Sequence, residues 1–458
     1  MRIPALFALC SALTAQGGPP QPLPPLPVPA QNPITPAKAM LGKLLFWEEQ
    51  VSTNNRVACG TCHTFGAGGG DLRRQRHPGP DGMAPSPDDI FASPGIIRSD
   101  ANNDYRPDPV FGFDPQITDR ASPSFLTAAW FQDLFWDGRA RGSFVDPDSG
   151  ATLIPAGGAL ESQALFPPLS SVEMAHDAHD LAQLTDKLAN VRPMALATNL
   201  PADMAAAISG GVTYADLFAS AFGTPDITAA RFAYAVATYQ RTLVPNQTPY
   251  DAFVAGNPAA LTPQQQNGLN VFMGPGRCGL CHTTGLFSDG QFHNLGLRPI
   301  GEDNGRQAVT GSPADAGRFK TPSLRNVGLR NTFMHNGQFS SLPQVFGFYL
   351  NGGGPFGQNK DPLLVPLNVP PPAANDLINF LANGLTDARI LQGLPPFDRP
   401  TLRSQLLGSQ GAQYGVGSPG TGGIVPGILA EVPANLGNID FKLGVHDARG
   451  GAMAASRG

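Results

Sequence analysis

Two stretches of this 458-residue chain have the residue types and spacing of a covalent haem attachment site. Each is a Cys-x-x-Cys-His motif, formed by Cys59, Cys62 and His63 in the first copy and by Cys278, Cys281 and His282 in the second. In such a motif the two thiols add to the porphyrin vinyl groups and the adjacent histidine binds the iron. The sequence therefore predicts two covalently bound haem c groups, with His63 and His282 as iron ligands.

Other interpretations of a Cys-x-x-Cys pair are a zinc site and a thioredoxin-like dithiol. Neither motif has a second ligand pair at zinc-finger spacing, and a dithiol does not explain the histidine that follows both copies. The chain has five cysteines, and four of them belong to the two motifs. The pattern therefore favours haem attachment.

The fifth cysteine, Cys10, lies in an N-terminal segment typical of a short secretory leader. Residues 1–15 contain one basic residue, Arg2, followed by an apolar run from Ile3 to Leu13. Haem c is attached outside the cytoplasm, so the leader and the motifs together predict an exported, periplasmic protein. No apolar run reaches membrane-spanning length, and a net charge of −5 does not indicate nucleic-acid binding.

The same helix-start pattern precedes both motifs. At Thr35-Pro36 and Thr262-Pro263 a threonine N-cap precedes a proline in the first turn. Each start is followed by a glycine and, four residues later, a phenylalanine: Gly42 and Phe46 in the first copy, Gly268 and Phe272 in the second. We interpret this as an internal repeat of two cytochrome-c-like helical modules.

The predicted fold is mainly α, with two cytochrome-c-like helical domains, long ordered loops and a Gly-rich C-terminal appendage. The 54 glycines and 47 prolines favour long loops over regular sheet. We expect a leader at 1–15, a Pro-rich linker at 16–36, haem domains at 37–245 and 246–400, and a β-leaning or loosely ordered tail of unknown role at 401–458. Amphipathic helices are expected at 173–189, 228–243 and 374–385, and residues 125–135 also have apolar side chains at helical spacing.

Two further motifs complete the pattern. Phe135-Trp136-Asp137-Gly138-Arg139-Ala140 lies between the haem motifs, and residues 319–326 read Phe-Lys-Thr-Pro-Ser-Leu-Arg-Asn after the second. With the motifs in this order, residues 35–395 resemble the bacterial di-haem cytochrome c peroxidases, a superfamily that includes MauG. The resemblance implies two helical domains whose haems face each other. The N-terminal haem would react with hydrogen peroxide, and the C-terminal haem would relay electrons.

The resemblance gives roles to three side chains around the first haem. Glu173, in a Glu-Met pair, matches the acid–base residue that moves the peroxide proton. Gln163 has the family's spacing over the same pocket, and Trp136 matches the tryptophan that carries electrons between the haems. The alternative for Glu173 is a carboxylate that stabilises a helix N-terminus. The alternative for Trp136 is an aromatic side chain of the core.

The sixth ligand of the second haem is expected from Tyr349. This position is Met in the cytochrome c peroxidases and Tyr in MauG, and the axial ligand tunes the haem potential. Tyr349 could instead be a tyrosine of the core, and Met334 is the alternative ligand.

A distal histidine in a long loop closes the first haem in many family members. His77 is the only histidine between residues 64 and 175, and it lacks the Gly-His context of that loop. We therefore expect His77 to be exposed and the first haem to be five-coordinate and ready without reductive activation. The other histidines are expected to be surface residues (His176, His179) or hydrogen-bond partners around the second haem (His293, His335).

The family also binds calcium between its haems, through one asparagine side chain and two backbone carbonyls. The asparagine position falls on Ala121 here, and the carbonyl positions fall on Arg330 and Thr332. Loss of the only side-chain ligand leaves a calcium site in doubt.

Together these features predict an exported di-haem peroxidase that reduces hydrogen peroxide. Electrons would come from a small redox protein, such as a cytochrome c or a cupredoxin, or from the side chains of a partner protein, as with MauG. The alternative is a non-catalytic di-haem electron-transfer cytochrome, which would keep both irons six-coordinate.

Overall fold

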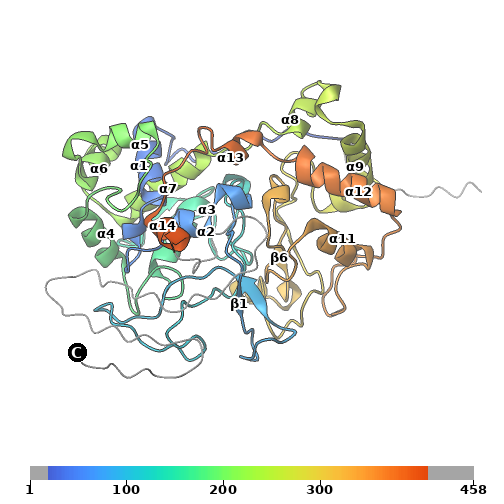
Figure 1. The fold of residues 1–458 in the computed structure, drawn as a ribbon, viewed down its shortest axis with the longest axis horizontal. Coiled ribbons are helices and arrows are strands. Elements are labelled where there is room, and N and C mark those ends of the chain that lie inside the picture. Colours follow the sequence, from blue (N-terminus) through green and yellow to red (C-terminus); the bar gives the residue numbers. More distant parts are fainter. Residues whose placement is uncertain (1–18, 411–458) are drawn as a thin grey trace, which may run out of the picture.

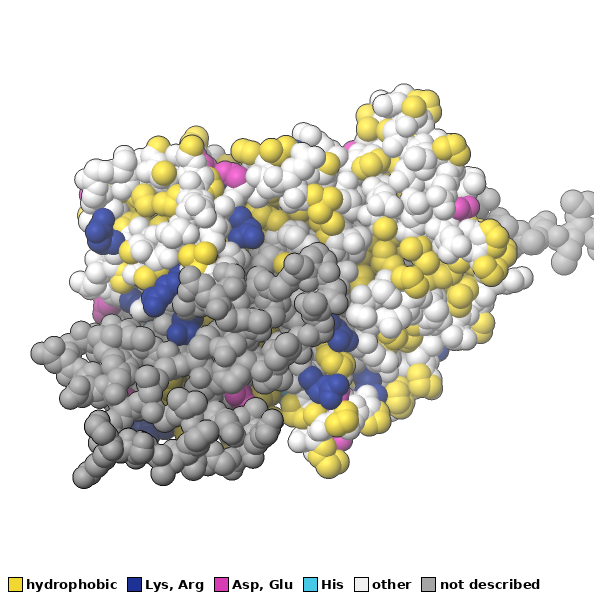
Figure 2. Space-filling model, in the orientation of Figure 1, with side chains coloured by type: hydrophobic (Ala, Val, Ile, Leu, Met, Phe, Trp, Pro, Cys, Tyr) yellow, Lys and Arg dark blue, Asp and Glu magenta, His cyan; other side chains and the backbone are white. Residues whose placement is uncertain are grey.

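The computed structural model describes residues 19–410 of the chain, without the side chains of 407–410 (Figure 1). The predicted leader at 1–15 and the tail beyond residue 410 lie outside the described residues. Among the helices of the described part, none combines the length and the apolar character needed to cross a membrane. Charged side chains form small, scattered groups on the described surface in Figure 2, as expected for a chain with 14% charged residues.

The described residues are mainly helical, as predicted. Their α-helices are α1 (Pro36–Phe46), α2 (Cys59–Cys62), α3 (Ala159–Ala164), α4 (Leu181–Asn190), α5 (Ala202–Ala207), α6 (Tyr214–Phe222), α7 (Ala229–Thr242), α8 (Pro249–Val254), α9 (Pro263–Met273), α10 (Gln307–Thr310), α11 (Leu342–Leu350), α12 (Pro371–Asn379), α13 (Ala388–Gln392) and α14 (Arg403–Gln410). Their strands form two-stranded antiparallel sheets: β1 (Gln75–His77) with β2 (Ile90–Ala92), β3 (Phe144–Val145) with β4 (Thr152–Ile154), and β5 (Phe292–His293) with β6 (Phe319–Lys320).

The internal repeat corresponds to two equivalent helix crossings. Helices α1 and α9 begin where predicted, and the hydroxyls of Thr35 and Thr262 accept hydrogen bonds from backbone N–H groups of the first turn. A Cβ atom on Gly42 would lie 1.9 Å from a carbonyl oxygen of α7, and one on Gly268 would lie 2.2 Å from a carbonyl oxygen of α12. Glycine is therefore required at both positions because the partner backbone occupies the space of a side chain.

These crossings lie in two separate cores, which Figure 1 shows as two groups of helices on either side of the molecule. The first core is built on α1, α4, α6 and α7, and the second on α8, α9 and α12. After α13 the chain returns to the first group, because Ile390, Phe397 and Leu402 pack in the first core. The predicted domain boundaries at 245 and 400 remain predictions.

The Pro-rich segment contacts both helix groups. The Tyr250 hydroxyl donates to the carbonyl of Gln21 (2.8 Å), and the Trp130 indole donates to the carbonyl of Pro24 (3.0 Å). The side chain of Asn32 is fully buried and donates to Glu161 (2.8 Å). The predicted spacer is therefore fastened to both halves of the protein.

Two local predictions are wrong, and a third concerns a segment that is only partly described. Residues 125–135 contain only a 3-10 turn, Ala128–Trp130, and Phe135 has a left-handed φ of 66° that no α-helix accepts. The helix predicted over 173–189 begins only at Leu181, where Asp180 forms a capping box. The tail is expected to be β-leaning or loosely ordered; its described start forms α14, and the rest of it lies outside the described residues.

The start of α14 has a physical cause that lies far away in the sequence. The carboxylate of Glu49 accepts hydrogen bonds from the backbone N–H groups of Arg403 (2.8 Å) and Ser404 (2.9 Å). These are N–H groups of the first helical turn, which have no partner inside the helix. A carboxylate also interacts favourably with the positive end of the helix dipole. Glu49 therefore supplies a cap that the local sequence lacks.

Candidate active site

Each Cys-x-x-Cys-His motif lines its own internal cavity. The first cavity has a volume of about 130 Å³, and the second about 220 Å³, counted as the space open to the centres of water molecules. The first is lined by Cys59, Cys62 and His63, and the second by Cys278, Cys281 and His282. Two thiols and an imidazole facing a mostly apolar cavity are the donor set of a haem c site, so the residues present fit this cofactor.

The first motif forms the one-turn helix α2, with His63 directly after it. A Cβ atom on Gly60 would lie 2.2 Å from the ring of Trp47, so the motif rests directly on that indole. His63 Nδ1 lies 3.2 Å from the Gly69 carbonyl oxygen and 3.2 Å from the Ser122 hydroxyl. Burial lowers the pKa of His63, which favours the neutral imidazole that metals require.

The second motif reproduces this arrangement. A 3-10 turn spans Cys278–Leu280, and His282 Nδ1 lies 2.9 Å from the Phe287 carbonyl oxygen. Burial also lowers the pKa of His282. A hydrogen bond on Nδ1 fixes the tautomer and the orientation of a metal-binding imidazole, so both histidines are prepared in the same way for iron.

Side chains far from the first motif in the sequence converge on its cavity. Gln163 on α3, Pro167 and Glu173 line the cavity together with His63, as the sequence predicted for the distal pocket. Burial raises the pKa of Glu173 to about 6, although the nearby Arg139 cation opposes the shift. Their catalytic roles remain predictions.

Several hydrogen bonds hold the loop that carries Glu173, three of which show how it is fixed. The Ser170 hydroxyl accepts from the backbone N–H of Glu173 (3.2 Å), and the backbone N–H of Ile96 donates to the Val172 carbonyl (3.0 Å). The side chain of Gln116 donates to the Ser171 carbonyl (2.7 Å). Segments from the long stretch between the first motif and residue 123 therefore fix the position of this carboxyl group.

Four residues line both cavities, namely Pro123, Ser124, Trp136 and Lys320, and two of them have large side chains, Trp136 and Lys320. Trp136 is 8% exposed, and its indole donates to the carbonyl of Ala121 (2.7 Å). Lys320 is 9% exposed, and its Nζ lies 4.1 Å from the centre of the Phe131 ring. Burial lowers the pKa of Lys320 to about 7. The position between the cavities agrees with the predicted place of Trp136, whereas sequence reasoning gave Lys320 no role.

An ion-pair network fixes the Trp136 segment against the second half of the protein. Arg120 lies 2.6 Å from Asp137 and 2.7 Å from Asp303, and Arg306 lies 2.8 Å from Asp133. Such buried charges contribute little net stability, because desolvation offsets their attraction. They nevertheless connect the segment around Trp136 to residues 303–306 of the second half.

The second cavity contains both candidates for its sixth ligand. Tyr349 on α11 and Met334 line it together with His282. The Tyr349 hydroxyl has no hydrogen-bond partner among residues 19–406, and burial raises its pKa. A polar group in this state is available to a ligand. The geometry does not distinguish the two candidates, so Tyr349 remains a prediction.

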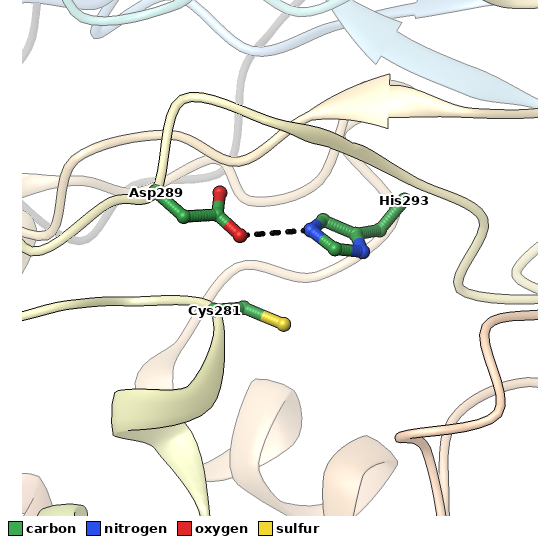
Figure 3. Close-up of side chains that lie close together, drawn as sticks. All are labelled: Cys281, Asp289 and His293. Carbon is green, nitrogen blue, oxygen red and sulfur yellow. Dashed lines mark hydrogen bonds and ion pairs between the residues drawn. The ribbon is translucent and has the colours of Figure 1, made fainter. Parts of the chain in front are cut away.

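A cluster beside the second motif has the composition of a metal site (Figure 3). Ligand atoms of Cys281, Asp289 and His293 all lie within 4.8 Å of one another. However, Cys281 belongs to the haem motif, and both nitrogens of His293 contact carboxylates, of Asp289 at 2.9 Å and of Asp361 at 2.6 Å. Hydrogen bonds with Asp289, then with Cys281 and with Asp361, raise the pKa of His293 to about 11, although burial opposes the shift. The imidazole is therefore a cation at neutral pH and offers no lone pair to a metal.

Two predictions about other histidines need correction. His77 on β1 is half-buried rather than exposed, with its ring 5.3 Å from that of Phe111. It is not among the residues that line the first cavity. His176, interpreted as a surface residue, is only 5% exposed and packs edge-to-face against His179 at 4.8 Å.

Comparison with known proteins agrees with these two cavities. The family model for di-haem cytochrome c peroxidase matches residues 36–259. The chain is 31% identical over 331 residues to methylamine utilization protein MauG of Methylorubrum extorquens, covering 72% of each chain. It is 28% identical over 416 residues to cytochrome-c peroxidase IdrP1 of Denitromonas iodatirespirans, covering 82% of this chain and 90% of the relative.

The fold also matches a solved structure. A MauG-like protein associated with microbial copper homeostasis superposes with a TM-score of 0.57 and 25% identity, over 83% of this chain and 97% of that one. Sequence and structure comparisons thus point to the same group of haem enzymes. The chain belongs to the di-haem cytochrome c peroxidase and MauG family, and it is an oxidoreductase of the di-haem peroxidase type.

Proposed function

We propose that the chain is an exported di-haem c-type peroxidase that reduces hydrogen peroxide in the first cavity. The observation that carries the proposal is the convergence of Glu173 and Gln163 on the cavity of His63, with His77 outside it. A pure electron carrier has no need of an acid–base group over an open iron. The relatives named as cytochrome c peroxidases support the same reaction.

The residues that would hold the cofactors are those of the two motifs. Cys59 and Cys62 would form the thioether bonds of the first haem, and Cys278 and Cys281 those of the second. Bound haem supplies the redox-active iron. Lys320, a buried amine between the cavities, would pair with the carboxylates of the cofactor.

Glu173 would move protons in the first cavity. Reduction of hydrogen peroxide to two water molecules consumes two electrons and two protons. A carboxyl group with a pKa of about 6 exists in both protonation states near neutral pH. Glu173 can therefore take the proton from one peroxide oxygen and deliver it to the leaving one. The amide of Gln163 would orient the peroxide beside it.

Electrons would reach the first cavity from the second through Trp136. An indole is oxidisable and remains neutral when buried, so it suits a relay between two redox centres. Its position in the wall of both cavities supports this role. Tyr349 would be the sixth ligand of the second haem. Its oxygen would favour the ferric state and thus a centre that accepts and stores oxidising equivalents.

The electron donor would be a small redox protein, a cytochrome c or a cupredoxin. Oxidation of a partner protein is the second candidate, and the identity with MauG and the tyrosine in the second cavity favour it. Both would operate outside the cytoplasm, where haem c is attached. This export is proposed from the two motifs and from the leader-like residues 1–15.

Paired thiol variants test which cavity reacts. In the matured holoprotein, Cys59→Ser with Cys62→Ser should leave one covalent haem and abolish the rapid reaction with peroxide. Cys278→Ser with Cys281→Ser should also leave one haem, but it should keep the peroxide reaction and lose donor-driven turnover. The masses of the denatured chains report the haem content, and stopped-flow absorbance reports the reaction. Loss of the peroxide reaction in the second variant alone would disprove the assignment.

A further inference from the structure

Arg330 is a cation in an unusual place, the junction between the two cavities. It follows the 3-10 turn Val327–Leu329 and lines the second cavity. Its guanidinium also packs against the loop after the first motif, because a Cβ atom on Gly70 would lie 2.8 Å from Arg330 Nη1. The side chain therefore touches both halves of the site.

Among the described residues, the hydrogen-bond partners of this guanidinium are carbonyl oxygens. Arg330 Nη2 donates to the carbonyl of Ser122 (3.0 Å), and Arg330 Nε donates to the carbonyl of Thr332 (3.2 Å). Within the described residues no carboxylate pairs with it, whereas Arg120, Arg241 and Arg325 each have an acidic partner. Burial lowers the pKa of Arg330 to about 10, which leaves it charged at neutral pH. A charged group that is held by carbonyl dipoles alone resembles a bound metal ion.

The residues around Arg330 are also those expected to bind the calcium ion that the family resemblance implies. The position expected to supply the only side-chain oxygen is Ala121, which has a methyl group and is 1% exposed. The carbonyl of Ala121 accepts from the Trp136 indole, and the carbonyl of Thr332 accepts from Arg330. Calcium needs six to eight oxygen ligands. The residues present therefore do not fit this ion, and a guanidinium beside them would repel it.

We infer that the Arg330 guanidinium is a built-in cation that takes the place of calcium between the two cavities of this protein. It links the Thr332 carbonyl, one of the two carbonyls expected to bind calcium, to the Ser122 carbonyl of the first half, and it needs no metal to do so. The inference does not depend on which cavity reacts with peroxide.

Arg330 is also connected to the first iron ligand. Ser122, whose carbonyl accepts from Arg330, directs its hydroxyl to His63 Nδ1 at 3.2 Å and to the Cys62 carbonyl at 3.1 Å. The Gly69 carbonyl, the other partner of His63 Nδ1, belongs to the loop that packs against Arg330. Arg330 is thus a positioning residue for His63, acting through Ser122 and this loop.

The calcium content of the unmodified holoprotein is the first test. After passage through a calcium-free column it should contain less than a tenth of a calcium ion per chain by plasma mass spectrometry. Addition of EGTA or of millimolar calcium should leave its paramagnetic resonance spectrum and its melting temperature unchanged. One tightly held calcium ion per chain, or a spectrum that changes when calcium is removed, would overturn the inference.

An arginine variant tests the positive part of the inference. Arg330→Ala should shift the resonance signal of the first haem, and free guanidinium should restore the original signal, whereas Arg330→Lys should restore it only in part because lysine lacks the planar fork. Arg231→Ala, on α7 and outside both cavities, is the matched control and should not change the spectrum. Restoration by calcium instead of guanidinium, or an unchanged signal in Arg330→Ala, would contradict the role of Arg330. The calcium measurement decides the question even if the variant does not fold.

Discussion

Replacement of Glu173 by glutamine should separate the activity of this protein from its stability. Glutamine keeps the size and polarity of the side chain but cannot carry a proton between the peroxide oxygens. General acid–base groups contribute roughly 10²- to 10⁴-fold to rate, so the peroxide reaction should slow by that factor. The same change should make the folded protein more stable at neutral pH, because the buried carboxyl group of Glu173 is ionised there at a cost in folding free energy.

The size of the stability gain follows from the pKa of Glu173. Burial raises this pKa from 4.5 to about 6, and the difference corresponds to roughly 2 kcal/mol. Since the side chain is half-buried, solvent screening reduces the effect to about 1–2 kcal/mol. The folded state binds the proton more tightly than the unfolded state, so stability falls as pH rises from 4.5 to 6. This loss of folding stability is complete above pH 6 and absent below pH 4.5. In Glu173→Gln the loss does not occur, because glutamine does not ionise.

Stopped-flow absorbance and scanning calorimetry of the ferric holoprotein measure the two effects. At pH 7.5, Glu173→Gln should react slowly and melt roughly 1–2 °C higher, since an unfolding entropy of about 2.1 cal/mol/K per residue makes 1 kcal/mol shift the midpoint of a 458-residue chain by about 1 °C. At pH 4.5 the two melting temperatures should converge. Asp186→Asn, which changes an exposed carboxylate on α4, is the control and should alter neither quantity. Unchanged peroxide turnover would refute the acid–base role, and an unchanged melting temperature at pH 7.5 would refute the burial argument.

Three further predictions concern the second cavity, the relay and the fold. Tyr349→Phe should convert the low-spin resonance signal of the second haem to high spin, and Met334→Leu should not; the opposite pattern would make Met334 the ligand. Trp136→Phe should slow the spread of oxidising equivalents to the second haem by at least tenfold in stopped-flow spectra. Trp130→Phe is the control and should leave the rate intact. Equal rates in the unmodified protein and both variants would exclude the relay. Gly268→Ala should destabilise the second core by roughly 1–3 kcal/mol or more in denaturant unfolding, because its Cβ would lie 2.2 Å from a carbonyl oxygen of α12, and a loss below 0.5 kcal/mol would contradict this helix crossing.

The helical elements nearest the motifs were predictable because their signals are local. Thr35 and Thr262 each cap a helix that follows within one residue, so nearby sequence contains all the information. The start of α14 depends instead on Glu49, more than three hundred residues away, and no local pattern could reveal it. The apolar residues at 125–135 have helical spacing for another reason. They are buried in the first core and in a small cluster with residues of α3 and α7, so burial without a helix produced the period.

In the site, too, some features were predictable from the sequence and others depend on the folded chain. The motif residues and Glu173 were predictable from residue type, spacing and family resemblance, and the structure brings them to the expected cavities. The side chains of Lys320 and Arg330 received no role, because only the folded chain reveals that Lys320 lies between two cavities and that the Arg330 guanidinium has no acidic partner among the described residues. The half-buried position of His77 likewise depends on its contact with Phe111, which lies 34 positions further along the chain.

Paramagnetic resonance of the as-isolated ferric holoprotein, before and after one equivalent of hydrogen peroxide, tests the central claim most directly. The claim is that the first cavity holds an open haem iron beside Glu173. It predicts one high-spin and one low-spin signal, and it predicts that peroxide bleaches the high-spin signal before any reductant is added. Two low-spin signals that ignore peroxide until one haem is reduced would contradict it, and they would mean that His77 or another side chain closes the first site.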